Sequence, residues 1–161
     1  MQVMGNPDRV TDRIVKLLHL SRLFNLPVVL TEQYSKWLGP TLSPIKEALP
    51  EYDPIEKLDF NCCSVDLFNT RLKANALDNI ILVGVETHIC VFQTCVSLLE
   101  RGYRVHVPHH AVDSRTGDNW NIGLSLMKEA GAVITSTETV VFQILKQAGT
   151  KEFKEMLKVI K

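Results

Sequence analysis

Cys90 is the residue with the clearest potential for chemistry, and it lies in the sequence GVETHICV at residues 84–91. An apolar run ends at Val85, a short polar stretch follows it, and helically spaced apolar residues resume at Ile89. The pattern predicts a strand, a turn and a helix whose first turn holds the cysteine. Unpaired N–H groups and the positive end of the helix dipole favour a thiolate there. Cys90 is therefore a candidate nucleophile; the competing interpretation is a buried core cysteine, which is the commoner case.

Three further polar residues lie beside expected strand ends, where parallel sheets bind their ligands. Glu32 and Gln33 follow a β-branched run at residues 27–31, and His88 lies in the turn before Cys90. Carboxylate, amide and imidazole groups can all hydrogen-bond a ligand. Strand ends are also often polar without any function, and His88 could equally cap a backbone carbonyl, so both interpretations stay open.

The other cysteines give weaker signals. Cys95 lies five residues after Cys90, mostly on another face of the expected helix, and we expect it in the core. The adjacent Cys62 and Cys63 do not bridge each other readily because their side chains point apart. We expect one of the two to be buried and the other exposed.

A metal site is not expected. His109 and His110 follow an expected strand, but Asp113 is the only carboxylate near them and the other histidines are scattered. The favoured interpretation of residues 113–115 is the cap and entry of the next helix. We predict no metal and no other cofactor.

The elements that must position these residues alternate between helix and strand. The surface excursion at 34–54 carries Gly39 and four prolines, and it includes a short helix at 43–48. The apolar run 79–85 is expected to be central and buried on both faces. The expected helices cover residues 8–24, 65–76, 89–101, 120–130, 137–148 and 151–158, and the expected strands cover 27–31, 79–85, 104–107 and 132–136, with 55–60 as an extended edge segment.

Strands separated by helices imply right-handed crossovers between parallel strands. We therefore predict an α/β fold, a three-layer α/β/α sandwich with a mostly parallel, Rossmann-like sheet. The 161 residues are expected to form a single domain spanning 1–161.

Composition excludes several classes of protein. With 45% hydrophobic and 22% charged residues, the 18.2 kDa chain is not intrinsically disordered. Eighteen basic residues balance eighteen acidic ones, which argues against a nucleic-acid partner. The apolar runs are too short to span a membrane, and the first residues show no apolar leader. Because the cysteines also lack a secreted disulfide pattern, we predict a cytoplasmic protein.

Several motifs resemble those of the isochorismatase-like cysteine hydrolase superfamily, and most closely the eukaryotic isochorismatase domain-containing proteins. They occur in the family's order over nearly the whole chain, and the Gly-Val-x-Thr-x-x-Cys-Val turn is the most specific of them. The matching segments are TEQY at 31–34, LG at 38–39, EKLDF at 56–60, GVETHICVFQT at 84–94, LLERGY at 98–103 and TSTE at 135–138.

The resemblance implies a catalytic trio of Asp, Lys and Cys. Cys90 matches the nucleophile and Lys57 matches the lysine, because Lys57-x-x-Phe60 stands where the family has Lys-x-x-Phe-Ser; Asn61 replaces that serine. The implied chemistry is hydrolysis of a small amide or ester, or of a vinyl ether as in isochorismatase itself. The family's metal-using amidases hold zinc through an Asp and two His after the second strand, whereas residues 32–39 here contain no histidine.

The resemblance also assigns the residues around the nucleophile. It places a non-proline cis peptide near Val85–Glu86, and it forms the oxyanion hole from backbone N–H groups of the turn before Cys90. On this basis the expected turn residues are Val85, Glu86, Thr87 and Ile89, and the expected substrate-binding residues are Glu32, Gln33, Tyr34 and His88.

The sequence departs from the family at the catalytic aspartate. The family Asp ends a first, central strand that lies upstream of the helix at 8–24, so Asp8 and Asp12 cannot replace it. We therefore expect that strand to be absent from residues 1–161, which would leave 27–31 and 79–85 with free edges. His110 also stands where relatives usually have Asp.

Three hypotheses for function follow. The first is a cysteine hydrolase acting on a small molecule. The second is a catalytically inactive family member that works as a binding or oligomeric scaffold, and the missing Asp favours it. The third, a thiol redox protein, ranks last because the chain lacks a CxxC motif. As in relatives, we expect a homo-oligomer, either a dimer or a tetramer.

Overall fold

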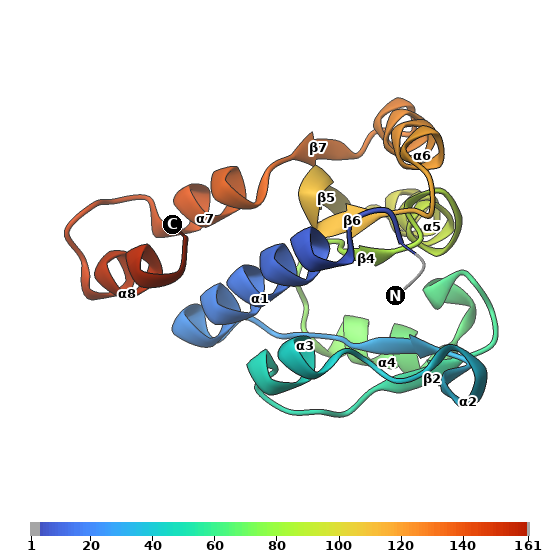
Figure 1. The fold of residues 1–161 in the computed structure, drawn as a ribbon, viewed down its shortest axis with the longest axis horizontal. Coiled ribbons are helices and arrows are strands. Elements are labelled where there is room, and N and C mark those ends of the chain that lie inside the picture. The colour runs from blue at the N-terminus through green and yellow to red at the C-terminus, as the bar shows by residue number, and fades with distance from the viewer. Residues whose placement is uncertain (1–3, 161) are drawn as a thin grey trace.

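Helices surround short parallel strands in the computed structural model, which describes residues 4–160 (Figure 1). The strands are β1 (Thr31–Gln33), β2 (Ile55–Lys57), β3 (Asn79–Ile81), β4 (Gly84–Val85), β5 (Arg104–Pro108), β6 (Val112–Asp113) and β7 (Val133–Thr135). The α-helices are α1 (Pro7–Phe24), α2 (Ser35–Leu38), α3 (Ser43–Ala48), α4 (Asp66–Ala74), α5 (Phe92–Glu100), α6 (Gly117–Glu129), α7 (Thr137–Leu145) and α8 (Lys151–Ile160).

The strands form three small sheets, and every strand pair is parallel. The sheets have the orders β1-β2, β3-β5-β7 and β4-β6. Figure 1 shows β1 and β2 with α2, α3 and α4 on one side of α1, and the other two sheets with α5 and α6 on the opposite side. The predicted α/β class with parallel strands is confirmed, whereas the extent of the single domain stays a prediction.

The apolar run 79–85 does not form one strand, so that prediction is wrong. The β3–β5 pairing ends as the backbone N–H of Leu82 donates to the carbonyl of His106 at 2.9 Å. Gly84 then adopts a φ of +120°, which turns the chain out of that sheet. Gly84 and Val85 pair instead with β6. This break carries the end of the run, and the turn after it, to a different sheet.

The first strand lies later than predicted. Residues 27–30 pair with no strand, because their partner β2 begins only at Ile55. The first hydrogen bond between the two segments runs from the Ile55 N–H to the Leu30 carbonyl at 2.9 Å. Within residues 4–160, β1 pairs only with β2 and β3 only with β5. One edge of each strand is therefore unpaired, as expected. That a central strand is missing from the chain stays a prediction.

Helix ends follow ordinary capping chemistry. Gly102 follows α5 with a φ of +86°, as predicted for a C-terminal glycine. Helix α6 begins at Gly117, earlier than predicted, because the hydroxyl of Thr116 accepts the Asn119 N–H at 3.3 Å. Thr116, rather than a residue at 113–115, is therefore the cap.

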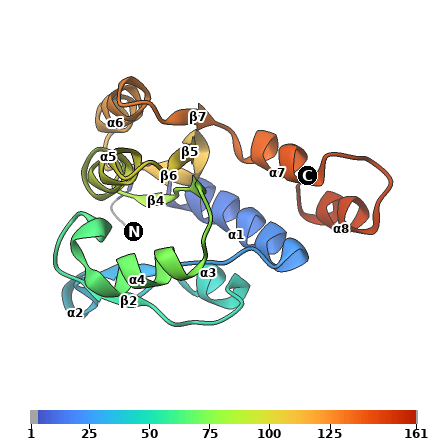
Figure 2. The ribbon, with the colours of Figure 1, turned by 180° about the vertical axis from the view of Figure 1, so that it is seen from behind.

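Three clusters of apolar side chains form the core. The largest includes Leu98 of α5, Val105 and Val107 of β5, and Met127 of α6, all almost completely buried. The second packs α1 on α3, and the third packs α1 on α7 and α8, which extend away from the sheets in Figure 2. None of the helices in residues 4–160 is long and apolar enough to cross a membrane.

Candidate active site

Cys90 lies in a π-helical turn, Thr87–Val91, which connects β4 to α5. The peptide bond between Val85 and Glu86 is cis, at the position that the resemblance implied. The Glu86 carbonyl accepts the N–H groups of Ile89 at 3.1 Å and Val91 at 3.2 Å, so neither N–H is free for a ligand. Single π-helical turns occur frequently at functional sites.

The thiol of Cys90 is partly buried and not disulfide-bonded. Burial raises its pKa, while the positive charge of Lys57 and a hydrogen bond from the Glu86 backbone N–H act in the opposite direction. Burial outweighs both, so the net pKa is above the ordinary value. The thiolate expected from the helix start is therefore not favoured by residues 4–160 alone. The charge of Lys57 and the backbone N–H of Glu86 nevertheless act to lower the pKa of this thiol.

Lys57 ends β2, and only 5% of it is exposed. Its ammonium donates to the side-chain oxygen of Gln33 and to the carbonyls of Asp59 at 3.0 Å and Phe60 at 3.2 Å. These acceptors are all neutral, and no carboxylate oxygen within residues 4–160 lies within 4 Å of the ammonium. A buried charge without an opposite charge is unusual in proteins.

Gln33 and Tyr34 lie beside Lys57, as expected of residues at neighbouring strand ends. Gln33 contacts the Lys57 ammonium and also donates through Nε2 to the Leu58 carbonyl at 2.6 Å. The Tyr34 N–H donates to the Lys57 carbonyl at 3.0 Å, but its side chain is exposed. Gln33 is thus held in the candidate site, and Tyr34 lies at its surface.

Glu32 has a different environment from the one its position suggested. Its Oε1 accepts hydrogen bonds from the Thr41 N–H at 2.8 Å, the Thr41 hydroxyl at 2.6 Å and the Tyr52 hydroxyl at 2.7 Å. Burial acts to raise the pKa of Glu32, but these hydrogen bonds outweigh it and lower the pKa overall. The carboxylate therefore anchors the 34–54 segment to β1.

No local pattern in the sequence indicates the contacts between the π-helical turn and the segment after β6. The Nδ1 atom of His88 lies 3.0 Å from the Ser114 hydroxyl. Glu86 Oε2 accepts from both the backbone N–H and the Nε of Arg115, each at 3.1 Å. Strand β6 has only two residues, too few for a periodic signal, which explains why sequence reasoning missed these partners.

Asp113 and Ser114 contact the N-terminal residues Gly5, Asn6 and Arg9. The Asp113 carboxylate is buried, accepts the Asn6 N–H at 2.7 Å and lies 3.8 Å from the Arg9 guanidinium. The Gly5 N–H also donates to the Ser114 carbonyl at 3.0 Å. Asp113 is therefore committed to structural contacts.

Both Cys62 and Cys63 are buried, which corrects the prediction that one would be exposed. The 3-10 turn at residues 62–64 packs on α5, where the Cys62 N–H donates to the Thr94 hydroxyl at 3.0 Å. Cys95 is fully buried, as predicted, and burial raises its pKa to about 11.

The histidine pair has a structural environment. The ring centroids of His109 and His110 lie 3.7 Å apart, and His109 Nδ1 is 2.7 Å from the Thr135 carbonyl oxygen. Residues 4–160 contain no cluster of three or more potential metal ligands.

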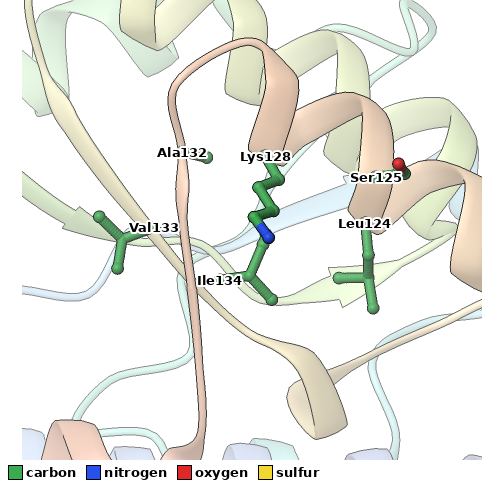
Figure 3. Close-up of a pocket in the computed structure, with 6 residues that line it drawn as sticks. All are labelled: Leu124, Ser125, Lys128, Ala132, Val133 and Ile134. Atoms are coloured by element: carbon green, nitrogen blue, oxygen red, sulfur yellow. The ribbon is translucent and has the colours of Figure 1, made fainter.

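Two surface cavities differ in their relation to this site. One of about 390 Å³ is lined by the residues after Lys57, together with Ser64 and Gln93. The other, of about 500 Å³, lies between α6 and β7, and Figure 3 shows the Lys128 side chain extending across it towards Ile134. Only the first adjoins a candidate residue, because the Lys57 ammonium donates to the carbonyls of its lining residues Asp59 and Phe60.

Comparisons with known proteins agree with the motifs. The family model described as the isochorismatase domain matches residues 2–139. The secreted isochorismatase effector Isc1 of Phytophthora sojae is 39% identical over 150 residues, which are 90% of this chain and 71% of that protein.

Solved structures are similar over most of the chain. One described as the MAR1 ribonuclease of Caenorhabditis elegans has 35% identity and a TM-score of 0.92, covering 99% of this chain and 82% of that chain. The YcaC protein of Escherichia coli, described as an octameric hydrolase of unknown specificity, has 25% identity and a TM-score of 0.82, covering 88% of this chain and 70% of that chain. The resemblance seen in the motifs is thus confirmed: the chain belongs to the isochorismatase family, together with eukaryotic isochorismatase domain-containing proteins that it resembles.

Proposed function

We propose that this protein is a hydrolase that uses Cys90 as a nucleophile on a small amide, ester or vinyl ether. One observation carries the proposal: Cys90 is a free, partly buried cysteine in the π-helical turn between β4 and α5, and the buried charge of Lys57 acts to lower its pKa against the larger effect of burial. A charge held in a partly dry site acts more strongly than one in water. Family membership supports the same chemistry, and the YcaC neighbour is described as a hydrolase.

For an amide or ester the proposed reaction has two steps. The thiol loses its proton to a base, and the thiolate sulfur bonds to the carbonyl carbon while the leaving amine or alcohol departs with a proton. Water then attacks the thioester and releases the acid, which regenerates the thiol. Lys57 stabilises the thiolate, and N–H groups of the turn around Glu86 and Thr87 stabilise the oxyanion.

The function is tested by trapping the covalent intermediate. The protein is incubated with a panel of small amides, esters and vinyl ethers, quenched with acid, and the peptide containing Cys90 is analysed by mass spectrometry. The panel also includes an RNA oligonucleotide, because the C. elegans neighbour is described as a ribonuclease. We expect turnover of a small molecule and an acyl mass on Cys90 with an amide or ester. Turnover without modification of Cys90 by any acyl substrate would contradict the nucleophile.

The base is proposed to be a carboxylate from outside residues 4–160. The Lys57 ammonium has only neutral acceptors, and β1 and β3 each have an unpaired edge beside which a further strand could lie. A strand ending in Asp there would supply both a counter-ion for Lys57 and an acceptor for the thiol proton. Residues 1–3 and 161 contain no carboxylic side chain.

Intact mass spectrometry of the protein purified from its source tests this proposal. We expect a mass above 18.2 kDa, by about the length of a strand and a loop. A mass of 18.2 kDa would favour the second function, an inactive member that binds a ligand or forms a scaffold, because the trio would then lack its base. The partial burial of Cys90, which raises its pKa despite the charge of Lys57, is the observation that favours this alternative.

We also propose a homo-oligomer, as in the octameric YcaC protein. Trp37 and Leu38 of α2 are 78% and 65% exposed, and Leu58 and Phe60 after β2 are 70% and 53% exposed. Both pairs of residues follow the paired ends of β1 and β2, where Gln33 lies opposite Lys57. An exposed apolar cluster of this kind is typical of an interface.

Size-exclusion chromatography with light scattering measures the assembly. We expect a mass that is a multiple of 18.2 kDa, and we expect the double variant Trp37→Ser and Leu58→Ser to dissociate towards the monomer. The matched control is Leu67→Ser, an exposed leucine on α4, which should leave the assembly intact. A monomer at tens of micromolar, or an assembly that the double variant does not weaken, would contradict the proposed surface.

A cytoplasmic location remains a proposal, supported by four cysteines that form no disulfide. The relative Isc1 is described as secreted, so fractionation of the source cells is the direct measurement.

A further inference from the structure

Helix α6 meets the π-helical turn backbone to backbone at Gly123. A Cβ atom placed on Gly123 would lie 2.8 Å from the His88 nitrogen, 2.8 Å from the Thr87 carbonyl carbon and 2.9 Å from the His88 Cα. All three atoms belong to the backbone, so they cannot move aside as a flexible side chain would. Glycine inside a helix lowers its stability by about 1 kcal/mol relative to alanine. Helix propensity alone would therefore favour alanine at position 123.

Residues 114–123, which run from the end of β6 into α6, contact three consecutive residues of the turn that leads to Cys90. Arg115 binds the Glu86 carboxylate, Ser114 contacts His88, and Gly123 packs on the backbone of Thr87 and His88. These contacts hold the turn from one side.

We infer that Gly123 is a positioning residue for the nucleophile: its missing side chain lets α6 pack directly on the Thr87–His88 backbone and so fixes the π-helical turn that carries Cys90. The inference rests on the proposed role of Cys90. A side chain at position 123 would have to separate the two backbones by about 0.6 Å, from 2.8 Å to the 3.4 Å of an ordinary contact. A displacement of this size would shift the π-helical turn, and Cys90 with it, relative to the rest of the site.

The experiment compares Gly123→Ala with Gly117→Ala on the same helix. A Cβ at Gly117 would meet no atom within 4 Å, so this control adds the same methyl group without a clash. The readout is the rate at which iodoacetamide alkylates Cys90, followed by peptide mass spectrometry over a range of pH. This rate reports the thiolate and needs no substrate, so the positioning role is tested even if Cys90 hydrolyses nothing.

For Gly123→Ala we expect the midpoint of the pH profile to move upward, because a weaker hydrogen bond from Glu86 favours the thiolate less. At pH 7.5 the alkylation rate should fall by about threefold or more, which corresponds to a pKa increase of about half a unit. Gly117→Ala should match the wild-type profile. Loss of global stability by itself would not move the midpoint of the molecules that stay folded.

An unchanged pH midpoint in folded Gly123→Ala would overturn the inference, as would an equal shift in Gly117→Ala. If Gly123→Ala does not fold, Ser114→Ala decides, since it removes the contact to His88 without adding an atom. A smaller upward shift of the same profile is then expected, and no shift in Ser114→Ala would reject the positioning role of this segment.

Discussion

Replacing Cys90 with serine is expected to abolish hydrolysis of the substrate found in the panel, with a loss on the order of 10³-fold or more. A hydroxyl at this position would be a far weaker nucleophile than a thiolate, because neither Lys57 nor Glu86 can ionise it near neutral pH. The change removes no core packing, since the residue is only partly buried. The folded fraction and the melting temperature should stay close to those of the wild-type chain.

The matched control is the same substitution at Cys95, five residues further on and within α5. Cys95 is fully buried, so its serine variant places a hydroxyl among apolar groups and should cost about 1–3 kcal/mol of stability. Activity per folded molecule should be retained. Cys90→Ser should thus lower the rate and leave stability unchanged, whereas Cys95→Ser should lower stability and leave the rate unchanged. Full activity in Cys90→Ser would exclude the proposed mechanism.

Replacing Lys57 with methionine is expected to raise the pKa of Cys90, because the ammonium is the largest influence that favours the thiolate. Alkylation and hydrolysis near pH 7.5 should therefore fall, hydrolysis by about 10²-fold or more. The alkylation deficit should disappear as the pH rises above the new pKa, since both proteins then carry the thiolate. The measurement is the iodoacetamide rate at Cys90 as a function of pH.

Stability separates this effect from damage to the fold. Methionine has nearly the length of the lysine side chain, and the change removes a buried charge that has no carboxylate partner. The free energy of unfolding should therefore change by no more than about 2 kcal/mol in either direction. Lys36→Met, at an exposed lysine of α2, is the control and should change neither rate. A pH profile for Lys57→Met identical to wild type would show that Lys57 does not act on the sulfur.

The sequence allowed the class of fold and the centre of the site to be predicted because their signals are local. Apolar spacing predicted α1 and α5, and the pattern around Cys90 predicted a strand, a turn and a helix start there, although Cys90 lies in the π-helical turn rather than in the first turn of α5. The resemblance then supplied Lys57, which no local pattern would have identified. In the structure the charge of Lys57 acts to lower the pKa of Cys90, against the larger effect of burial.

The features that were missed depend on contacts between distant segments. The run 79–85 reads as one strand, and only the left-handed backbone of Gly84 and the partner β6 divide it. Gly123 looks in the sequence like a weak position within a helix, and its role is visible only against the backbone of His88. The raised pKa of Cys90 likewise follows from burial, which outweighs the local benefit of a helix start.

The division of the strands into separate small sheets has a consequence for how activity would be lost on heating. Lys57 belongs to the β1–β2 sheet, whereas Cys90 follows β4 of another sheet, and no strand pairing joins the two. Within residues 4–160 the two halves are joined by a shared apolar core and by hydrogen bonds such as that from the Cys62 N–H to Thr94, and such contacts can open locally at lower cost than the whole fold unfolds. On heating, activity would then be lost before the circular-dichroism signal of the helices, and it would return on cooling. The site lies between two parts of the fold that can separate locally without unfolding.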